Sequence, residues 1–209
     1  MKVAIVVPYF GTLPNYFQLF LDTCAYNPEF DWLIISNDTT AYRYPENVHF
    51  QEMSFAQCQS LVQSKFDFPV TLHTPQKLCD FRCAYGYIFS EYLTGYDWWG
   101  HCDLDQIFGR MSAFITEEML KDYDKIGSVG HLTLYRNNES NNGVYMMTDR
   151  YKEVFTMEKK DIDWGNLGFG YIKTDKRYVA TYKDGKWDDG ALVDDATITM
   201  SECPCVLQY

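Results

Sequence analysis

Short apolar runs alternate with amphipathic segments along the first part of the chain. Apolar residues dominate Val3–Val7, Trp32–Ser36 and Val48–Met53, as expected of short strands in a buried sheet. Apolar positions recur with helical spacing over 17–24 and again after Ser54. This succession of strands and helices predicts an α/β sandwich whose sheet is largely parallel in its first half.

Polar and turn-forming residues mark where these elements begin and end. Asn15 is a candidate cap for the first helix, and Asn27-Pro28 stops it. Ser54, with Gln57 three residues later, has the spacing of a capping box ahead of the second helix.

The middle of the chain continues the alternation. The spacing of apolar residues predicts a long helix over Leu78–Leu93, and Tyr96–Asp105 is predicted to be an apolar strand that ends in acidic residues. A helix that begins at Thr116 and strands near 125–128 and 131–135 follow.

The composition changes after Asn137. This part is rich in Asn, Gly, Asp and Lys, with the short aromatic alternations of FGYIKTDKRYVATYKDGKW, which are typical of loops and antiparallel strands. No internal repeat, low-complexity tract or linker divides the sequence. We therefore predict a single domain over 1–209, with halves at 1–109 and 110–209.

Composition and charge narrow the class of ligand. Of the 209 residues, 46% are hydrophobic and 22% are charged, which indicates one domain with a substantial core and excludes disorder and coiled coil. The formal net charge of −11 repels polyanions, so we expect no binding to nucleic acid. A small anionic ligand would need a basic pocket or a bridging cation.

Cysteine usage and hydropathy bear on the compartment. The seven cysteines are an odd number without a pair of C-x-x-C units, which favours a reducing cytosol. The apolar run before Pro8 is shorter than a signal-peptide core, and no segment approaches the roughly 20 apolar residues of a membrane span. We expect a cytoplasmic protein without an integral membrane segment, and any association with membranes to be peripheral.

Two carboxylates end an apolar predicted strand, in the segment WWGHCDLDQIFG. Residues i and i+2 of a strand point to one face, so Asp103 and Asp105 would lie close together. Burying two unpaired like charges is costly, and hard oxygen ligands suit Mg²⁺ or Mn²⁺ shared with substrate phosphates. The alternative for so short a motif is a solvated turn or a helix cap.

A second polar group lies in PQKLCDFRCAYGYIF. On a helix Lys77 and Asp80 would be neighbours, with Arg82 pointing elsewhere. Either cation could face a phosphate, while Asp80 accepts a hydrogen bond from a ribose or a base. The alternative is a surface ion pair.

Polar residues also follow the second predicted strand. Asn37 and Asp38 lie where parallel strands present their carboxyl ends, the edge at which open α/β sheets bind ligands, and could contact a nucleobase. An Asx turn is the alternative. His131, at the start of a later predicted strand, is expected to be structural, since a lone histidine usually is.

Three segments together resemble a known family. They are KLCDFRCAYGYIFSEYLTGYDWWGHCDLDQIFG, the opening VAIVVPYFG and the later GHLTLYRN. They resemble a bacterial family of glycosyltransferases with the type A nucleotide-sugar fold (GT-A), found among capsule and lipopolysaccharide genes. The resemblance covers roughly the first two-thirds of the chain. It implies a GT-A-like α/β/α sandwich with a mostly parallel central sheet and a smaller, irregular or antiparallel C-terminal portion.

The resemblance also implies an activity and a set of site residues. A sugar would pass from a nucleotide-diphosphate donor, UDP-linked, to a glycan or glycolipid acceptor in surface polysaccharide synthesis, with 1–109 binding the donor and 110–209 the acceptor. Mn²⁺ or Mg²⁺ would be held by Asp103 and Asp105. Pro8, Tyr9 and Phe10 are expected to line the nucleotide pocket. Asp38 is expected to approach the base. The residues expected to approach the ribose or the phosphates are Lys77, Asp80 and Arg82.

Departures from the family pattern keep alternatives open. Family members have Pro in place of Cys83 and continue past the point where this chain stops, so the acceptor half is expected to be short or truncated. A non-catalytic nucleotide-sugar binder or partner subunit on the same fold is therefore the alternative function. A metal-dependent phosphohydrolase is less favoured, because such enzymes usually place D-x-D after an N-terminal strand. The catalytic base is left unassigned among the late acidic residues Asp161, Asp163, Asp188, Asp189, Asp194 and Asp195.

Overall fold

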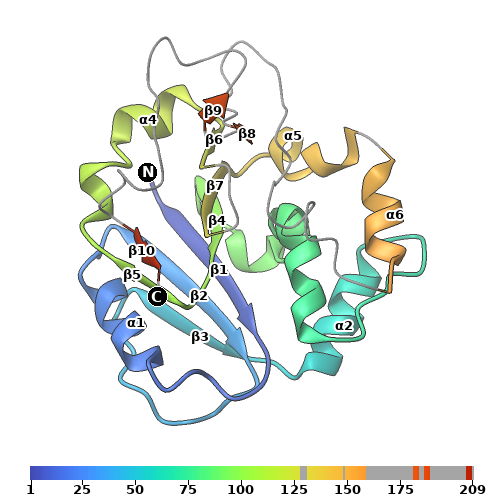
Figure 1. Cartoon of the computed structure of the whole chain (residues 1–209), viewed down its shortest axis with the longest axis horizontal. Coiled ribbons are helices and arrows are strands. Elements are labelled where there is room, and N and C mark those ends of the chain that lie inside the picture. Colours follow the sequence, from blue (N-terminus) through green and yellow to red (C-terminus); the bar gives the residue numbers. More distant parts are fainter. Residues whose placement is uncertain (128–130, 148, 159–180, 184–185, 189–205, 209) are drawn as a thin grey trace.

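A six-stranded sheet in the order β3-β2-β1-β4-β7-β6 forms the centre of the computed structural model (Figure 1). The structure describes residues 1–127, 131–147, 149–158, 181–183, 186–188 and 206–208. The strands of this sheet are β1 (Val3–Tyr9), β2 (Phe30–Ser36), β3 (Val48–Glu52), β4 (Trp98–Cys102), β6 (Lys125–Ile126) and β7 (Leu132–Arg136). The first four strands of that order are parallel, whereas β7 runs antiparallel to β4 and to β6. The predicted mostly parallel sheet is confirmed.

Helices cover both faces of the sheet. The α-helices are α1 (Phe17–Ala25), α2 (Phe55–Ser64), α3 (Tyr85–Ile88), α4 (Glu117–Asp122), α5 (Glu139–Asn142) and α6 (Arg150–Thr156). The 3₁₀ helices are η1 (Pro75–Ala84), η2 (Ser90–Leu93), η3 (Met111–Ala113) and η4 (Val144–Met147). Among the helices described, none combines the length and the apolar character needed to cross a bilayer.

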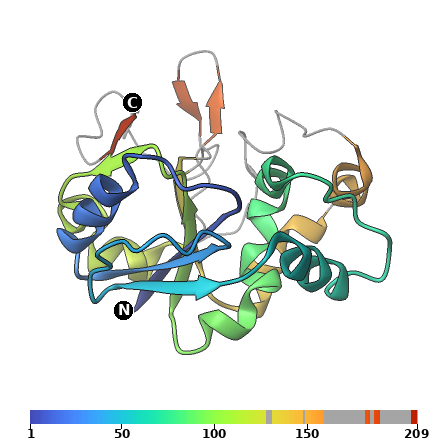
Figure 2. The same cartoon turned by 90° about the horizontal axis from the view of Figure 1, so that it is seen from below.

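The alternation of side chains along β1 explains the layers. Val3, Ile5 and Val7 belong to an apolar cluster with α1 and α4, whereas Ala4 and Val6 belong to a second cluster with α2, η1 and α6. Figure 2 separates the blue α1 from the teal and orange helices, which gather on the other side of the molecule. Alternate residues of β1 face opposite sides of the sheet, and helices pack against both sides. The predicted α/β/α sandwich is therefore confirmed.

Local capping signals have mixed outcomes. The capping box of Ser54 and Gln57 is present, and the Thr116 side chain accepts a hydrogen bond from the Met119 amide at the start of α4. The prediction of Asn15 as a cap is wrong: α1 is preceded by Tyr16, whose side chain makes no capping hydrogen bond.

The prediction of one long helix over Leu78–Leu93 is also wrong. That stretch is divided among η1, α3 and η2. In a 3₁₀ helix side chains align every three residues, and Leu78, Phe81 and Ala84 are all buried at that spacing. The sequence pattern was therefore compatible with both periods.

The C-terminal prediction is confirmed only in part. Antiparallel pairing joins β8 (Thr181–Lys183) to β9 (Lys186–Asp188), and β10 (Val206–Gln208) to β5 (Gln106–Phe108). The expectation of loops and strands directly after Asn137 is wrong, because the helices α5, η4 and α6 follow within 139–142, 144–147 and 150–156. Asn138 caps α5 through its side chain, so a residue interpreted as a loop signal begins a helix.

The described cysteines are free thiols. They are Cys24, Cys58, Cys79, Cys83 and Cys102. All except Cys79 are buried, and burial raises the pKa of the Cys58 thiol to about 12. These buried thiols therefore act as small apolar side chains in the core.

Lys125 gives the fold a testable pH dependence. This side chain is 2% exposed with its Nζ 5.4 Å from the centroid of the Tyr135 ring, and burial lowers the pKa of the lysine to about 8. Between about pH 8 and 10.5 the unfolded chain holds a proton that the folded chain has released, so stability rises with pH. We expect the free energy of unfolding of the wild type to gain about 2–3 kcal/mol relative to Lys125→Met over that interval.

Urea unfolding of both proteins at a series of pH values measures this difference. Groups that titrate alike in the two proteins cancel in the comparison. Parallel stability profiles for the two proteins would contradict the assignment.

Candidate functional site

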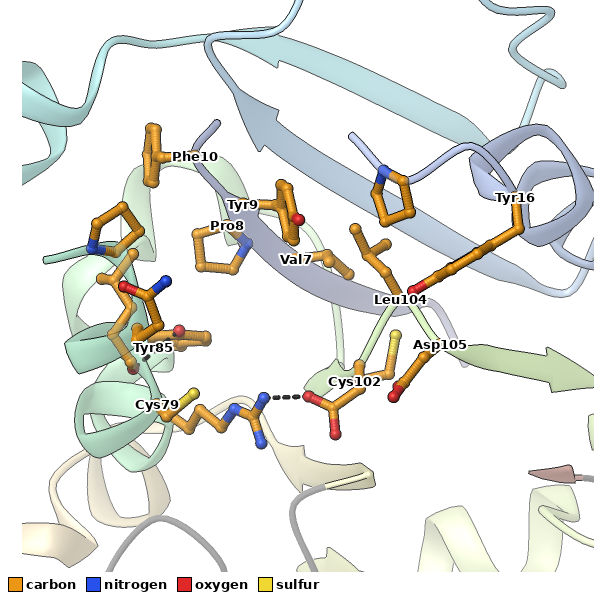
Figure 3. A pocket seen from close by; sticks show the side chains of 16 residues that line it. Val7, Pro8, Tyr9, Phe10, Tyr16, Cys79, Tyr85, Cys102, Leu104 and Asp105 are labelled. Carbon is orange, nitrogen blue, oxygen red and sulfur yellow. Dashed lines mark hydrogen bonds and ion pairs between the residues drawn. The ribbon is translucent and has the colours of Figure 1, made fainter. Parts of the chain in front are cut away.

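A cavity of about 420 Å³ opens at the carboxyl ends of β1 and β4 (Figure 3). We call it the edge cavity. Three segments line it: the end of β1 with the following loop, the helix η1, and the bend between β4 and β5. Since β1 and β4 are parallel neighbours, their carboxyl ends meet at one edge of the sheet, where α/β folds bind ligands.

The end of β1 supplies one wall. Pro8, Tyr9 and Phe10, the residues expected for a nucleotide pocket, all line the edge cavity. Figure 3 shows these side chains along the end of the strand. The chain then turns at Gly11, whose φ of +114° favours glycine.

Asn37 and Asp38 hold this loop in place. The Gly11 amide donates to Asn37 Oδ1 at 2.8 Å, and the Leu13 amide donates to Asp38 Oδ2 at 2.7 Å. Asp38 Oδ1 accepts from the amide and the hydroxyl of Thr40, and these hydrogen bonds lower the pKa of the carboxyl. Asp38 is not among the residues that line the edge cavity, so its contacts are those of the Asx-turn alternative.

The 3₁₀ geometry of η1 builds the opposite wall. Gln76, Cys79 and Arg82 occur every third residue and all line the edge cavity. Side chains at i and i+3 eclipse in a 3₁₀ helix, so the three form one row. An α-helix over the same residues would rotate them progressively away from one another.

Lys77 and Asp80 lie on another side of η1, away from the edge cavity. Lys77 Nζ donates to Asp80 Oδ2 at 2.7 Å and to the Val154 carbonyl at 2.8 Å. Their side chains are 3% and 0% exposed, so the interpretation as a surface ion pair is wrong. This buried pair joins η1 to α6.

The two acidic residues lie on a bend rather than on a strand. β4 ends at Cys102, so the predicted strand to Asp105 is three residues too long. Leu104 is 7% exposed and packs in the core, while Asp103 and Asp105 on either side of it both line the edge cavity. A bend anchored by its central leucine therefore directs both carboxylates to one cavity.

Asp103 is held between two basic side chains. Arg82 forms an ion pair with Asp103 Oδ1, drawn as a dashed line in Figure 3, and His131 Nδ1 lies 3.2 Å from Asp103 Oδ2. Burial alone would raise the pKa of Asp103, but the His131 hydrogen bond and the Arg82 charge outweigh it and lower the pKa. Asp103 is therefore ionised at neutral pH.

His131 is a site residue that the sequence pattern did not predict. Its hydrogen bond to Asp103 raises the pKa of the imidazole, and burial opposes this shift. The Asp103 amide also donates to the His131 carbonyl at 3.1 Å. The strand that follows His131 is β7, which pairs antiparallel with β4 and places His131 beside Asp103. The contact could have been predicted only if this pairing had been known.

Asp105 presents a different environment. Its Oδ1 atom is buried and has no hydrogen-bond partner among the described residues. Figure 3 shows the Tyr16 side chain extending toward Leu104 and Asp105. Burial first, and then the charge of Asp105, raise the pKa of the Tyr16 hydroxyl, which therefore keeps its proton at neutral pH.

A cation at this edge would need ligands beyond the carboxylates of the described residues. Within the part of the chain that the structure describes, no three His, Cys, Asp or Glu side chains are grouped so as to hold a metal ion. Two carboxylates leave places for water and phosphate oxygens, as is usual for Mg²⁺. The side chains of the six late acidic residues named above as candidate bases lie outside the described residues.

Comparison with known proteins identifies a family. The model described as "Family of unknown function (DUF6625)" matches residues 5–184. Curated relatives match only a short stretch. The branched-chain-amino-acid aminotransferases of Haemophilus influenzae and Helicobacter pylori are 56% and 52% identical over 50 residues, which is 24% of this chain. The chain spans 15% of the length of these relatives.

Solved structures with a similar arrangement are distant in sequence. A galactosyltransferase, LgtC, in complex with donor and acceptor sugar analogs has a TM-score of 0.40 at 12% identity, covering 78% of this chain and 69% of that chain. An active-site mutant of LgtC has a TM-score of 0.41 at 13% identity, with coverage of 78% and 68%.

Proposed function

We propose that this chain, which belongs to the DUF6625 family of unknown function, is a metal-dependent glycosyltransferase. It transfers a sugar from a nucleotide-diphosphate donor, UDP-linked, to a hydroxyl group of a glycan or glycolipid. One observation carries this proposal: Asp103 and Asp105 line the same edge cavity as Arg82 and the end of β1. That cavity combines carboxylates for a cation, a guanidinium for phosphate and aromatic walls for a base.

The residues present fit Mn²⁺ or Mg²⁺. Asp105 Oδ1 is a buried carboxylate oxygen without a described partner, and Asp103 is an ionised carboxylate on the same bend. These two residues would hold the cation, which when bound neutralises the charge of the departing diphosphate.

Arg82 would bind the diphosphate. Its side chain is 16% exposed and lines the edge cavity, where it forms an ion pair with Asp103. Arginine suits phosphate because its planar fork donates two parallel hydrogen bonds. Tyr9 and Phe10 would pack against the base and the ribose, because their rings line the same cavity.

The reaction itself requires little covalent chemistry from the protein. The acceptor oxygen forms a bond to the anomeric carbon, the bond to the diphosphate oxygen breaks, and the acceptor proton leaves to a base. Positive charge develops on the sugar and negative charge on the leaving group, so positioning and fixed charges supply the catalysis.

Calorimetric titration of UDP with and without Mn²⁺ tests the proposal. We expect UDP to bind only in the presence of Mn²⁺, whereas GDP and CMP bind more weakly. Equal affinity of UDP with and without the metal, or no nucleotide binding, would refute the proposal. Screening UDP-sugars for donor hydrolysis and transfer then follows.

A second candidate is a nucleotide-sugar-binding protein that does not catalyse transfer. It is favoured by the contacts of Asp103, since both of its oxygens are engaged by Arg82 and His131. Metal-dependent binding of UDP without turnover of any UDP-sugar would support this candidate over the transferase.

A further inference from the structure

We propose that a second cavity, next to the edge cavity, binds a sugar ring; the proposal extends the glycosyltransferase function. We call it the side cavity. Its volume is about 380 Å³, within the range of small-molecule sites. It shares Tyr16, Leu104 and Asp105 with the edge cavity and adds residues of α1 and β5.

Gln106 is the observation that points to a ligand. This side chain lines the side cavity and is 1% exposed, yet neither its Nε2 nor its Oε1 has a hydrogen-bond partner among the described residues. Native proteins rarely leave both ends of a buried amide unsatisfied. The amide offers donors at one end and an acceptor at the other, which matches a pair of neighbouring sugar hydroxyls.

The other walls select a neutral, partly apolar ligand. The described lining residues carry one carboxylate, Asp105, and no Lys or Arg, so an anion is disfavoured. Leu19, Phe20 and Ile107 supply apolar surface, which does not suit a hydrated ion. A sugar ring has C–H faces for this surface and hydroxyl groups for Gln106.

Tyr16 provides a platform at the boundary of the two cavities. The residue is 43% exposed and lines both of them. A flat ring with a hydroxyl group can stack on the face of a sugar and donate to one of its oxygens. A sugar in the side cavity would therefore lie directly beside any diphosphate near Asp105.

Binding of methyl glycosides, without nucleotide, tests the side cavity. We expect methyl galactoside, glucoside or N-acetylglucosaminide to give saturation-transfer NMR signals with the wild type. Gln106→Leu preserves the size of the side chain and should weaken this binding about tenfold or more, equivalent to about 1.4 kcal/mol. Gln51→Leu, on the edge strand β3, is the matched control and should bind as the wild type does.

A surface variant provides a second test that does not disturb the core. Tyr16→Leu should also weaken glycoside binding, whereas Tyr26→Leu, at a residue 58% exposed beyond α1, should not. Two results would overturn the proposal. One is the absence of glycoside binding to the wild type, and the other is binding by both Gln106→Leu and Tyr16→Leu that equals that of the wild type.

Titrations with UDP and UDP-sugars identify the source of the ring. If it belongs to the donor, Gln106→Leu weakens UDP-sugar but leaves UDP unchanged. If it belongs to the acceptor, the variant leaves both unchanged and loses glycoside binding in the presence of UDP. A third outcome separates the two proposals. If glycoside binding depends on Gln106 but UDP does not bind, the proposed transferase activity is refuted and the sugar site is supported.

Discussion

Replacing Asp105 with asparagine should strongly weaken the Mn²⁺-dependent binding of UDP. The substitution keeps the size of the side chain but removes the charge of the one carboxylate at the bend that has an oxygen without a described partner. A neutral amide oxygen is a much weaker ligand for a hard divalent cation. We expect UDP affinity in saturating Mn²⁺ to fall by about 100-fold or more, or about 2.7 kcal/mol. Calorimetric titration measures the change.

Asp22→Asn is the matched control for this experiment. Asp22 is exposed on α1, and its replacement changes the net charge by the same amount. UDP should therefore bind this variant as it binds the wild type. If Asp105→Asn retained metal-dependent UDP binding, the cation would have to be held elsewhere.

Replacing Arg82 with glutamine should change metal binding and nucleotide binding in opposite directions. Arg82 now pairs with Asp103, so a cation must compete with the guanidinium for that carboxylate. Without Arg82, Mn²⁺ alone should bind about tenfold more tightly, while UDP in saturating Mn²⁺ should bind about 10- to 100-fold more weakly. Titrations of Mn²⁺ without nucleotide, and of UDP with Mn²⁺, give the two values.

The opposite signs distinguish this role from general damage to the fold. A misfolded variant would lose both affinities, and the exposed control Arg110→Gln should change neither. If Arg82→Gln weakened Mn²⁺ and UDP alike, the ion pair with Asp103 would be a support for the metal site rather than a competitor. In the wild type, competition predicts that UDP increases the affinity for Mn²⁺, because phosphate draws Arg82 away from Asp103.

The strands of the first half could be predicted because their signal is local. A strand buried between two layers needs apolar residues at consecutive positions, and Val3–Val7 satisfies that need without reference to the rest of the chain. The capping box at Ser54 is equally local, because both partners lie within one helical turn.

Helical period was harder to predict. In η1, a period of three residues decides which side chains face the edge cavity and which, like Lys77 and Asp80, face away from it. Over so short a stretch, the spacing of apolar residues does not distinguish this period from the 3.6 residues per turn of an α-helix. The deciding contacts come from distant segments, such as the hydrogen bond from Lys77 to the Val154 carbonyl. Packing against α6 thus determined which polar residue faces the site.

Residue types and spacing along the chain were enough to identify an α/β sandwich and to select Asp103, Asp105 and Arg82 as candidate site residues. Tertiary contacts decided which residues share the edge cavity: they bring His131 to Asp103, bury Lys77 with Asp80, and leave Asp38 supporting a loop. The physical reason is range. Periodicity and capping depend on neighbours a few residues apart, whereas the charge environment of a carboxylate depends on groups that only the folded chain brings together.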